Sequence, residues 1–178
     1  MKVGFVSFIG RPNAGKSTLI NRIIGTKLAI VSDKPQTTRN RILAVRNYPG
    51  ESAAQVVLVD TPGIHRPLHR MNVRMVDVAI ESIGGVDLIG LVRDATDGLG
   101  AGDRFVLKAL DAASVPVILI LNKIDLIAKT RLLPIIEWYR RQREFTAIVP
   151  LSAYTGDGVD ILEREIIGRL PDGEPLYP

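Results

Sequence analysis

The glycine-rich segment at residues 10–17 contains the residue types that hold phosphate in many proteins. It fits the pattern G-x-x-x-x-G-K-[S/T], in which backbone N–H groups of the loop converge on phosphate oxygens. An apolar run at residues 3–9 precedes the loop, and residues 17–24 follow it with helical periodicity, so the loop would open a helix whose dipole favours anions. In this pattern Lys16 reaches the β- and γ-phosphates and the Ser17 hydroxyl ligates Mg²⁺. The segment therefore predicts a nucleoside triphosphate site with Mg²⁺.

The segment Asn-Lys-Ile-Asp at residues 122–125 indicates which base the site accepts. The Asp125 carboxylate can accept two hydrogen bonds, which fits the N1–H and N2–H₂ donors of guanine but no pair of donors on adenine. The Lys123 stem would lie against the ring, Asn122 would hold the loop and contact N7, and the backbone N–H of Ala153 would point at O6. These positions predict GTP or GDP as the ligand and leave an ATPase as the least favoured alternative.

The metal-facing side of the site is predicted from two further segments. Asp60 follows an apolar run and stands where a carboxylate contacts Mg²⁺ through water. Gly63 lacks a Cβ, so its N–H can approach the γ-phosphate closely. The polar loop at residues 31–40 offers Thr37 and Thr38 as a further Mg²⁺ ligand. The full set of predicted nucleotide-contacting positions is Arg11, Pro12, Asn13, Ala14, Gly15, Lys16, Ser17, Thr18, Asp60, Thr61, Pro62, Gly63, Asn122, Lys123, Asp125, Ser152 and Ala153.

Composition is that of a globular domain. With 178 residues the chain is long enough for one domain with a substantial core, and 46% hydrophobic and 24% charged residues are ordinary values for such a domain. The net charge of +4 permits an anionic partner without requiring one. The absence of cysteine excludes a disulfide framework and a thiolate metal site, and it suits the cytosol. The longest apolar run, residues 115–121, is too short to span a membrane.

Apolar runs alternate with helical periodicity, which predicts an α/β fold of three layers, with a mostly parallel six-stranded sheet and helices on both faces. The expected buried strands are residues 3–9, 56–59, 88–92, 117–121 and 148–151. Residues 41–48 alternate apolar and polar side chains before a Pro-Gly turn, which predicts one antiparallel edge strand. The expected helices are residues 17–24, 72–83, 104–113, 132–141 and 159–170. Residues 1–170 would form one domain, and residues 171–178, rich in proline and lacking periodicity, have the composition of a linker.

Taken together, the motifs resemble those of the Era-type GTPases, within the Era/TrmE-like branch of Ras-like P-loop proteins. The matching stretches are residues 10–21, 34–42, 59–65, 122–125 and 150–160. The resemblance implies a P-loop GTPase (Ras-like) fold and Mg²⁺-dependent hydrolysis of GTP to GDP and phosphate, as a switch in assembly of the small ribosomal subunit. It also implies a C-terminal KH domain beyond the linker that binds 16S rRNA. A cytoplasmic monomer is expected, with peripheral contact at the inner face of the cell membrane kept as an open alternative. Against relatives of this kind, Thr38 rather than Thr37 aligns as the Mg²⁺ ligand.

The resemblance also bears on hydrolysis, for which the expected catalytic positions are Lys16, Thr38, Gly63 and Asn13. Ile64 stands where Ras-like proteins place a glutamine that orients water, so unstimulated hydrolysis is expected to be slow. In related GTPases with an apolar residue there, an asparagine at the position of Asn13 helps bind K⁺ between the phosphates. For this chain, K⁺ is favoured as the factor that compensates for the missing glutamine. The alternative is a ribosomal partner that supplies the missing group.

Other interpretations stay open. One is a nucleotide-sensing binding module whose turnover is incidental, and another is a tRNA-modification or tandem-domain GTPase of the same branch, against which Gln36 argues mildly. Residues 31–40 and 63–74 are expected to be ordered by the γ-phosphate and released without it. The arginines at positions 140, 141 and 143 could contact RNA, but a solvated helix end is favoured for them.

Overall fold

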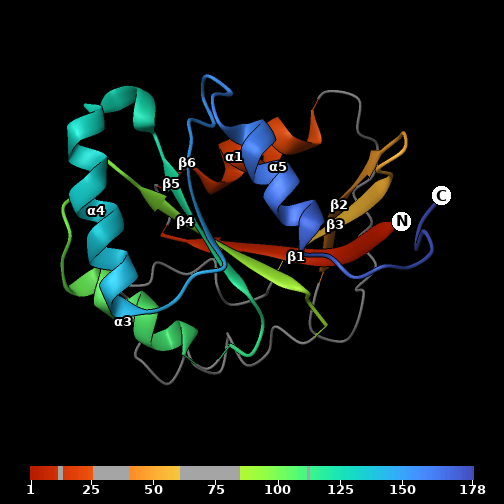
Figure 1. Ribbon diagram of the computed structural model, residues 1–178, viewed down its shortest axis with the longest axis horizontal. Coiled ribbons are helices and arrows are strands. Elements are labelled where there is room, and N and C mark those ends of the chain that lie inside the picture. The colour runs from red at the N-terminus through yellow and green to blue at the C-terminus, as the bar shows by residue number, and fades with distance from the viewer. Residues whose placement is uncertain (12–13, 26–40, 61–84, 112) are drawn as a thin grey trace.

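The computed structural model describes residues 1–11, 14–25, 41–60, 85–111 and 113–178, whose arrangement is shown in Figure 1. No helix within these ranges is long and apolar enough to cross a membrane. In chain order the elements are β1 (Lys2–Gly10), α1 (Lys16–Ile24), β2 (Arg41–Tyr48), β3 (Ala54–Asp60), β4 (Leu88–Asp94), α3 (Ala101–Leu110), β5 (Val117–Asn122), the 3₁₀ helix η2 (Ile124–Leu126), α4 (Lys129–Gln142), β6 (Ala147–Pro150) and α5 (Val159–Gly168).

The described strands form one six-stranded sheet in the order β2-β3-β1-β4-β5-β6. β1 lies parallel between β3 and β4, and β5 and β6 continue the parallel side of the sheet. β2 pairs antiparallel with β3, with a register shift between Ile42 and Ala44. The prediction of a mostly parallel sheet with Arg41–Tyr48 as its antiparallel edge strand is confirmed.

Successive side chains of the central strands enter two different cores. Along β5, Leu119 and Leu121 belong to the core that contains residues of α3 and α4, whereas Ile118 and Ile120 belong to the core that contains residues of α1 and α5. The two pairs of helices accordingly cover opposite faces of the sheet (Figure 1). A strand buried on both faces must be apolar at nearly every position, which is why uninterrupted apolar runs predicted these strands correctly.

Helix ends differ from the predicted ones by at most three residues, and a described contact explains one difference. α3 begins at Ala101 rather than at residue 104. Asp103 Oδ2 accepts the backbone N–H of Gly100 at 2.9 Å, which satisfies a donor at the start of the helix and fixes where the helix begins. The helix predicted at residues 72–83 lies outside the described residues.

The tail after α5 is fastened to the sheet. Gly173 N donates to Met1 O at 2.9 Å. The buried Gln55 side chain of β3 accepts the N–H groups of residues 176 and 177 at 2.8 and 3.2 Å and donates to the carbonyl of Tyr177 at 2.9 Å. The linker role expected for residues 171–178 stays a prediction, but this segment itself is held by specific hydrogen bonds.

Candidate functional site

The parallel strands end at one edge of the sheet, so the loops that follow them lie together. The register places Gly10 of β1 beside Val92 of β4, and Asp94 of β4 beside Asn122 of β5. The phosphate-loop segment, the segment at residues 122–125 and the loop after β6 are thereby brought to one place, as the sequence predicted.

Asn122 connects these three loops through its side chain. Its Nδ2 donates to Ala14 O in the phosphate-loop segment at 2.9 Å. Its Oδ1 accepts the backbone N–H of Lys123 at 2.8 Å and that of Ala153 at 3.0 Å. Asn122 is 2% exposed, so these bonds are shielded from competing water. The predicted loop-holding role of Asn122 is seen directly in this geometry, whereas its predicted contact with N7 stays a prediction.

Gly15 lies where the phosphate-loop segment meets helix α1. It is the N-cap of the helix, with a φ of 88°, and it offers no side chain to cap the first turn. A Cβ at this position would lie 2.2 Å from Asn122 Nδ2, so only glycine permits this approach of the two loops. The first turn of α1 contains no acidic residue. The backbone N–H groups of this first turn and the half-buried Lys16 therefore make the N-terminus of α1 favourable for an anion such as a phosphate group.

The loop after β5 presents Lys123 and Asp125 at the same edge. Lys123 has a left-handed backbone, with a φ of 70°, and its Nζ lies 2.8 Å from Asp94 Oδ2. Asp125 lies in η2 and is exposed, so its carboxylate is accessible from solvent. An accessible carboxylate beside a positioned lysine can accept hydrogen bonds from the edge of a base.

The loop after β6 is held from two sides. Ser152 N donates to Asp157 O at 2.8 Å, which closes the loop on itself. Arg22 of α1 donates through Nε to Ala153 O at 3.0 Å and through a second nitrogen to Tyr154 O. Because Ala153 N–H already donates to Asn122 Oδ1, the predicted bond to guanine O6 requires this donor to be shared or exchanged, and that contact stays a prediction.

Residues 5–123 match the family model described as 50S ribosome-binding GTPase. The chain belongs to this GTPase family. Within the family it is 50% identical over 175 residues to the GTPase Era of Geotalea uraniireducens, covering 98% of this chain and 58% of that protein. It is 47% identical over 176 residues to the GTPase Era of Ruminiclostridium cellulolyticum, covering 99% and 58%. The chain thus spans less than two thirds of the length of these relatives.

Two solved structures of Era superpose on this GTPase-family chain with a TM-score of 0.78 and 41% identity, each covering 100% of this chain and 60% of theirs. One is Aquifex aeolicus Era bound to GDP·AlF4⁻. The other is Era in complex with MgGDPNP and nucleotides 1506–1542 of 16S ribosomal RNA. The resemblance to Era-type GTPases and the P-loop GTPase fold predicted from the motifs are confirmed.

Part of the predicted site lies outside the described residues: Pro12, Asn13, Thr38, Thr61, Pro62 and Gly63. Asp60 is the last residue of β3, at the same edge as the other loops. Of the remaining predicted positions in the phosphate-loop segment, Arg11, Ser17 and Thr18 are exposed and Ala14 is buried. Ser17 lies in the first turn of α1, and its role as a Mg²⁺ ligand stays a prediction.

Sequence reasoning missed a buried polar cluster beside the site, formed by Arg93 of β4, Asp103 of α3 and Tyr139 of α4. Arg93 Nε donates to Asp103 Oδ1 at 3.2 Å and to Tyr139 Oη at 3.0 Å, and Tyr139 Oη donates to Asp103 Oδ1 at 2.7 Å. Burial alone would raise the pKa of Asp103, but the hydrogen bonds from Tyr139 and Arg93 outweigh it and hold that pKa below its ordinary value. The available signal was a charged pair, Arg93-Asp94, that ends an apolar run.

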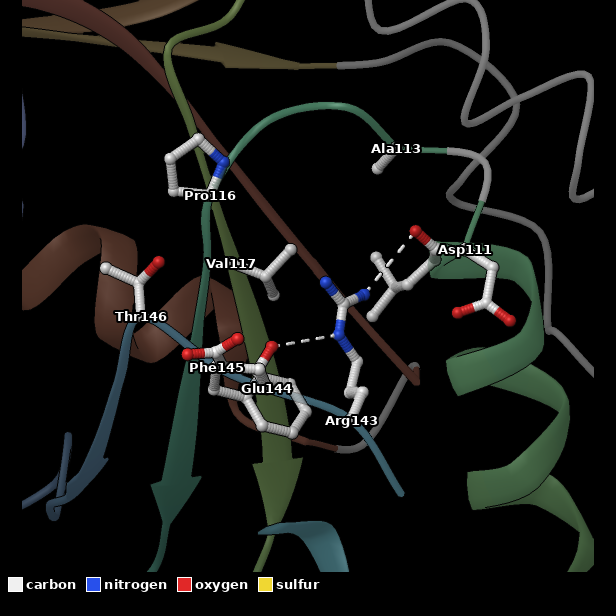
Figure 2. Close-up of a pocket in the computed structure, with 9 residues that line it drawn as sticks. Asp111, Ala113, Pro116, Val117, Arg143, Glu144, Phe145 and Thr146 are labelled. Carbon is white, nitrogen blue, oxygen red and sulfur yellow. Dashed lines mark hydrogen bonds between the residues drawn. The ribbon is translucent and has the colours of Figure 1, made fainter. Parts of the chain in front are cut away.

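A hollow of about 470 Å³ lies at the opposite end of β5, between the last turn of α3 and the start of β6 (Figure 2). Arg143 lies within it and donates to the carbonyls of Leu110 and Glu144, while its guanidinium stands over the Phe145 ring at 5.4 Å. Arg140 and Arg141 are exposed and the neighbouring Tyr139 is buried, as expected of a solvated helix end. None of the predicted site residues that the structure describes lines this hollow.

Proposed function

We propose that this chain is the guanine-nucleotide-binding domain of a GTPase that hydrolyses GTP to GDP and phosphate and acts as a switch in small-subunit ribosome assembly. The observation that supports it most is the Asn122 side chain, which ties the phosphate-loop segment to both loops expected to read the base. A single nucleotide would then contact all three loops, with phosphates at one end of the crevice and base at the other.

The proposed division of roles combines the described positions of Lys16, Ser17, Lys123 and Asp125 with the roles that the sequence predicts for the other residues. Lys16 and the N–H groups of the first turn of α1 neutralise the phosphates, and the Ser17 hydroxyl is a ligand for Mg²⁺, with Asp60 and Thr38 completing the metal side. Mg²⁺ supplies charge neutralisation of the β- and γ-phosphates when bound. Asp125 accepts the paired donors of guanine while the Lys123 stem lies against the ring. Gly63 N–H donates to the γ-phosphate.

Slow unstimulated hydrolysis is part of the proposal, because Ile64 cannot orient the attacking water. K⁺ bound with the help of Asn13 is the proposed source of the missing positive charge. The switch would consist of residues 31–40 and 63–74, which GTP orders and GDP releases. Amide exchange of these residues in GDP and in a non-hydrolysable GTP analogue tests this, since equal protection in both nucleotides contradicts it.

The partner proposal rests on relatives. Era in one solved structure is in complex with nucleotides of 16S rRNA. We infer that the protein containing this domain binds the same RNA through a C-terminal KH domain joined by residues 171–178. A cytoplasmic monomer completes the proposal, with peripheral contact at the inner membrane face as the alternative.

Base selection is the decisive test. Isothermal titration calorimetry with GDP, ADP and xanthosine diphosphate is expected to show tight binding of GDP alone by the wild-type chain. Asp125→Asn replaces one acceptor with a donor and should move the preference toward xanthine, whose 2-position offers an acceptor. Asp157→Asn, a like change at an exposed neighbouring residue, is the control and should keep the preference for guanine. Equal affinity of the wild type for ADP and GDP would contradict the proposal.

A further inference from the structure

Asp94 lies beside the base-reading loop without belonging to any of the predicted motifs. It is the last residue of β4 and stands opposite Asn122 in the parallel register. Ala95 N donates to Asn122 O at 2.9 Å, which fastens the two strand ends together. Asp94 Oδ2 then accepts the Lys123 ammonium at 2.8 Å. The carboxylate therefore contacts the side chain that is proposed to lie against the base.

The carboxylate of Asp94 is held by other groups of the protein itself. Its Oδ1 accepts both the N–H of Thr96 at 2.8 Å and the Thr96 hydroxyl at 2.6 Å. Asp94 is 8% exposed, and burial alone would raise its pKa. The hydrogen bonds from Lys123 and Thr96 outweigh burial and lower that pKa, so Asp94 is ionised at neutral pH.

The buried cluster holds the backbone around Asp94 as well. Arg93, the preceding residue, donates to Asp94 O at 2.6 Å and to Gly98 O at 3.1 Å. Asp103 binds the same guanidinium at 3.2 Å and accepts Gly100 N–H at 2.9 Å. The loop between β4 and α3 is thus pinned at both ends, and the direction of the Asp94 carboxylate is set by the fold.

We propose that Asp94 is a positioning residue that anchors the Lys123 ammonium and so presents the lysine stem to the nucleotide base. The inference deepens the proposed function and rests on it. A lysine side chain has several rotatable bonds, and a free one must lose that freedom each time a ligand binds. Anchoring Nζ at Asp94 removes most of this loss in advance, while the apolar stem stays available for contact with the ring.

The primary test is GDP affinity of Asp94→Asn, measured by calorimetry on the chain of residues 1–178. Asparagine keeps the size of the side chain and an oxygen that can accept from Thr96, but it removes the charge that holds Lys123. The dissociation constant for GDP is expected to rise by about three- to tenfold, the range of a partly buried ion pair that orders a binding group. Asp97→Asn, an exposed carboxylate in the same loop, is the matched control and should change the constant by less than about twofold.

The direction of the effect separates positioning from simple electrostatics. Removing a negative charge near an anionic ligand should by itself tighten binding, so a tighter or unchanged complex in Asp94→Asn would overturn the proposal.

A double-mutant cycle with Lys123→Met separates positioning from a structural role. Methionine keeps an unbranched apolar stem but has no ammonium to anchor, and the Asp94–Thr96 contacts remain, so this variant should fold. In the Lys123→Met background, Asp94→Asn is expected to cause no further loss of GDP affinity. An equal loss in both backgrounds would mean that Asp94 acts through the fold and not through Lys123, and it would overturn the inference.

Two further outcomes are informative. If Asp94→Asn does not fold, Lys123→Met alone is the test. A GDP affinity of Lys123→Met equal to that of the wild type would overturn the proposal. If the wild-type chain does not bind GDP, the proposed function fails. If the wild-type chain binds GDP and Asp94→Asn binds it equally well, only the proposed role of Asp94 fails.

Discussion

The Asn122→Ala substitution should lower the free energy of unfolding of the domain even when no nucleotide is bound. The substitution leaves three backbone groups without their partner: Ala14 O, Lys123 N–H and Ala153 N–H. Ala14 and Ala153 are 3% and 2% exposed, so water cannot readily replace the lost amide there. With a net cost of about 1 kcal/mol for each lost bond, the free energy of unfolding should fall by about 3 kcal/mol.

The assay is urea unfolding of the nucleotide-free chain, followed by circular dichroism. Asn47→Ala is the matched control, because Asn47 is exposed and its side chain accepts one described hydrogen bond, from Gln55 Nε2 at 2.8 Å. The control should lose at most about 1 kcal/mol. A loss below about 1 kcal/mol for Asn122→Ala would refute the reasoning, since the three loops would then be held by other contacts.

Three other substitutions test the site by different physical effects. Gly15→Ala places a Cβ on a residue with a left-handed backbone, 2.2 Å from Asn122 Nδ2. The free energy of unfolding, measured in urea, should fall by more than about 2 kcal/mol. A variant as stable as the wild type would show that the two loops can move apart without cost. Arg22→Ala removes the donor to Ala153 O and should weaken GDP binding by roughly tenfold in calorimetry, with partial recovery in Arg22→Lys. Unchanged affinity would mean that the loop after β6 does not depend on its contact with α1. Asp103→Asn should flatten the acid limb of the stability curve. The folded pKa of Asp103 lies below its unfolded value, so its contribution is present above about pH 4 and is lost as the pH falls through the folded pKa, and an unchanged acid limb in urea titrations at pH 3 to 6 would contradict this.

The sequence was sufficient to predict which segments are strands and where the ligand loops begin. Parallel strands buried on both faces leave uninterrupted apolar runs, and a loop at the end of such a run must lie at the carboxyl edge of the sheet. Gly10 and Asn122 could therefore be assigned to one edge without a structure.

The contacts between those loops could not be predicted, because they join residues far apart in the chain. Asn122 reaches Ala14 across 108 positions, and Arg22 reaches Ala153 across 131. Nothing in local periodicity distinguishes Arg22 from any other exposed arginine on a helix. Asp94 was visible as a carboxylate at a strand end, the same signal that marked Asp60, but the sequence alone offered no reason to connect it with Lys123.

The hydrogen bond between Met1 and Gly173 shows where a label can be attached to the domain. Gly173 N–H donates to Met1 O, and both lie at the amino end of β1, where the N and C labels stand close together in Figure 1. β1 has nine residues, so a fluorophore or surface tether attached at Met1 sits roughly 30 Å from the phosphate-loop segment. Immobilised or dye-labelled preparations made in this way should leave the nucleotide edge unobstructed.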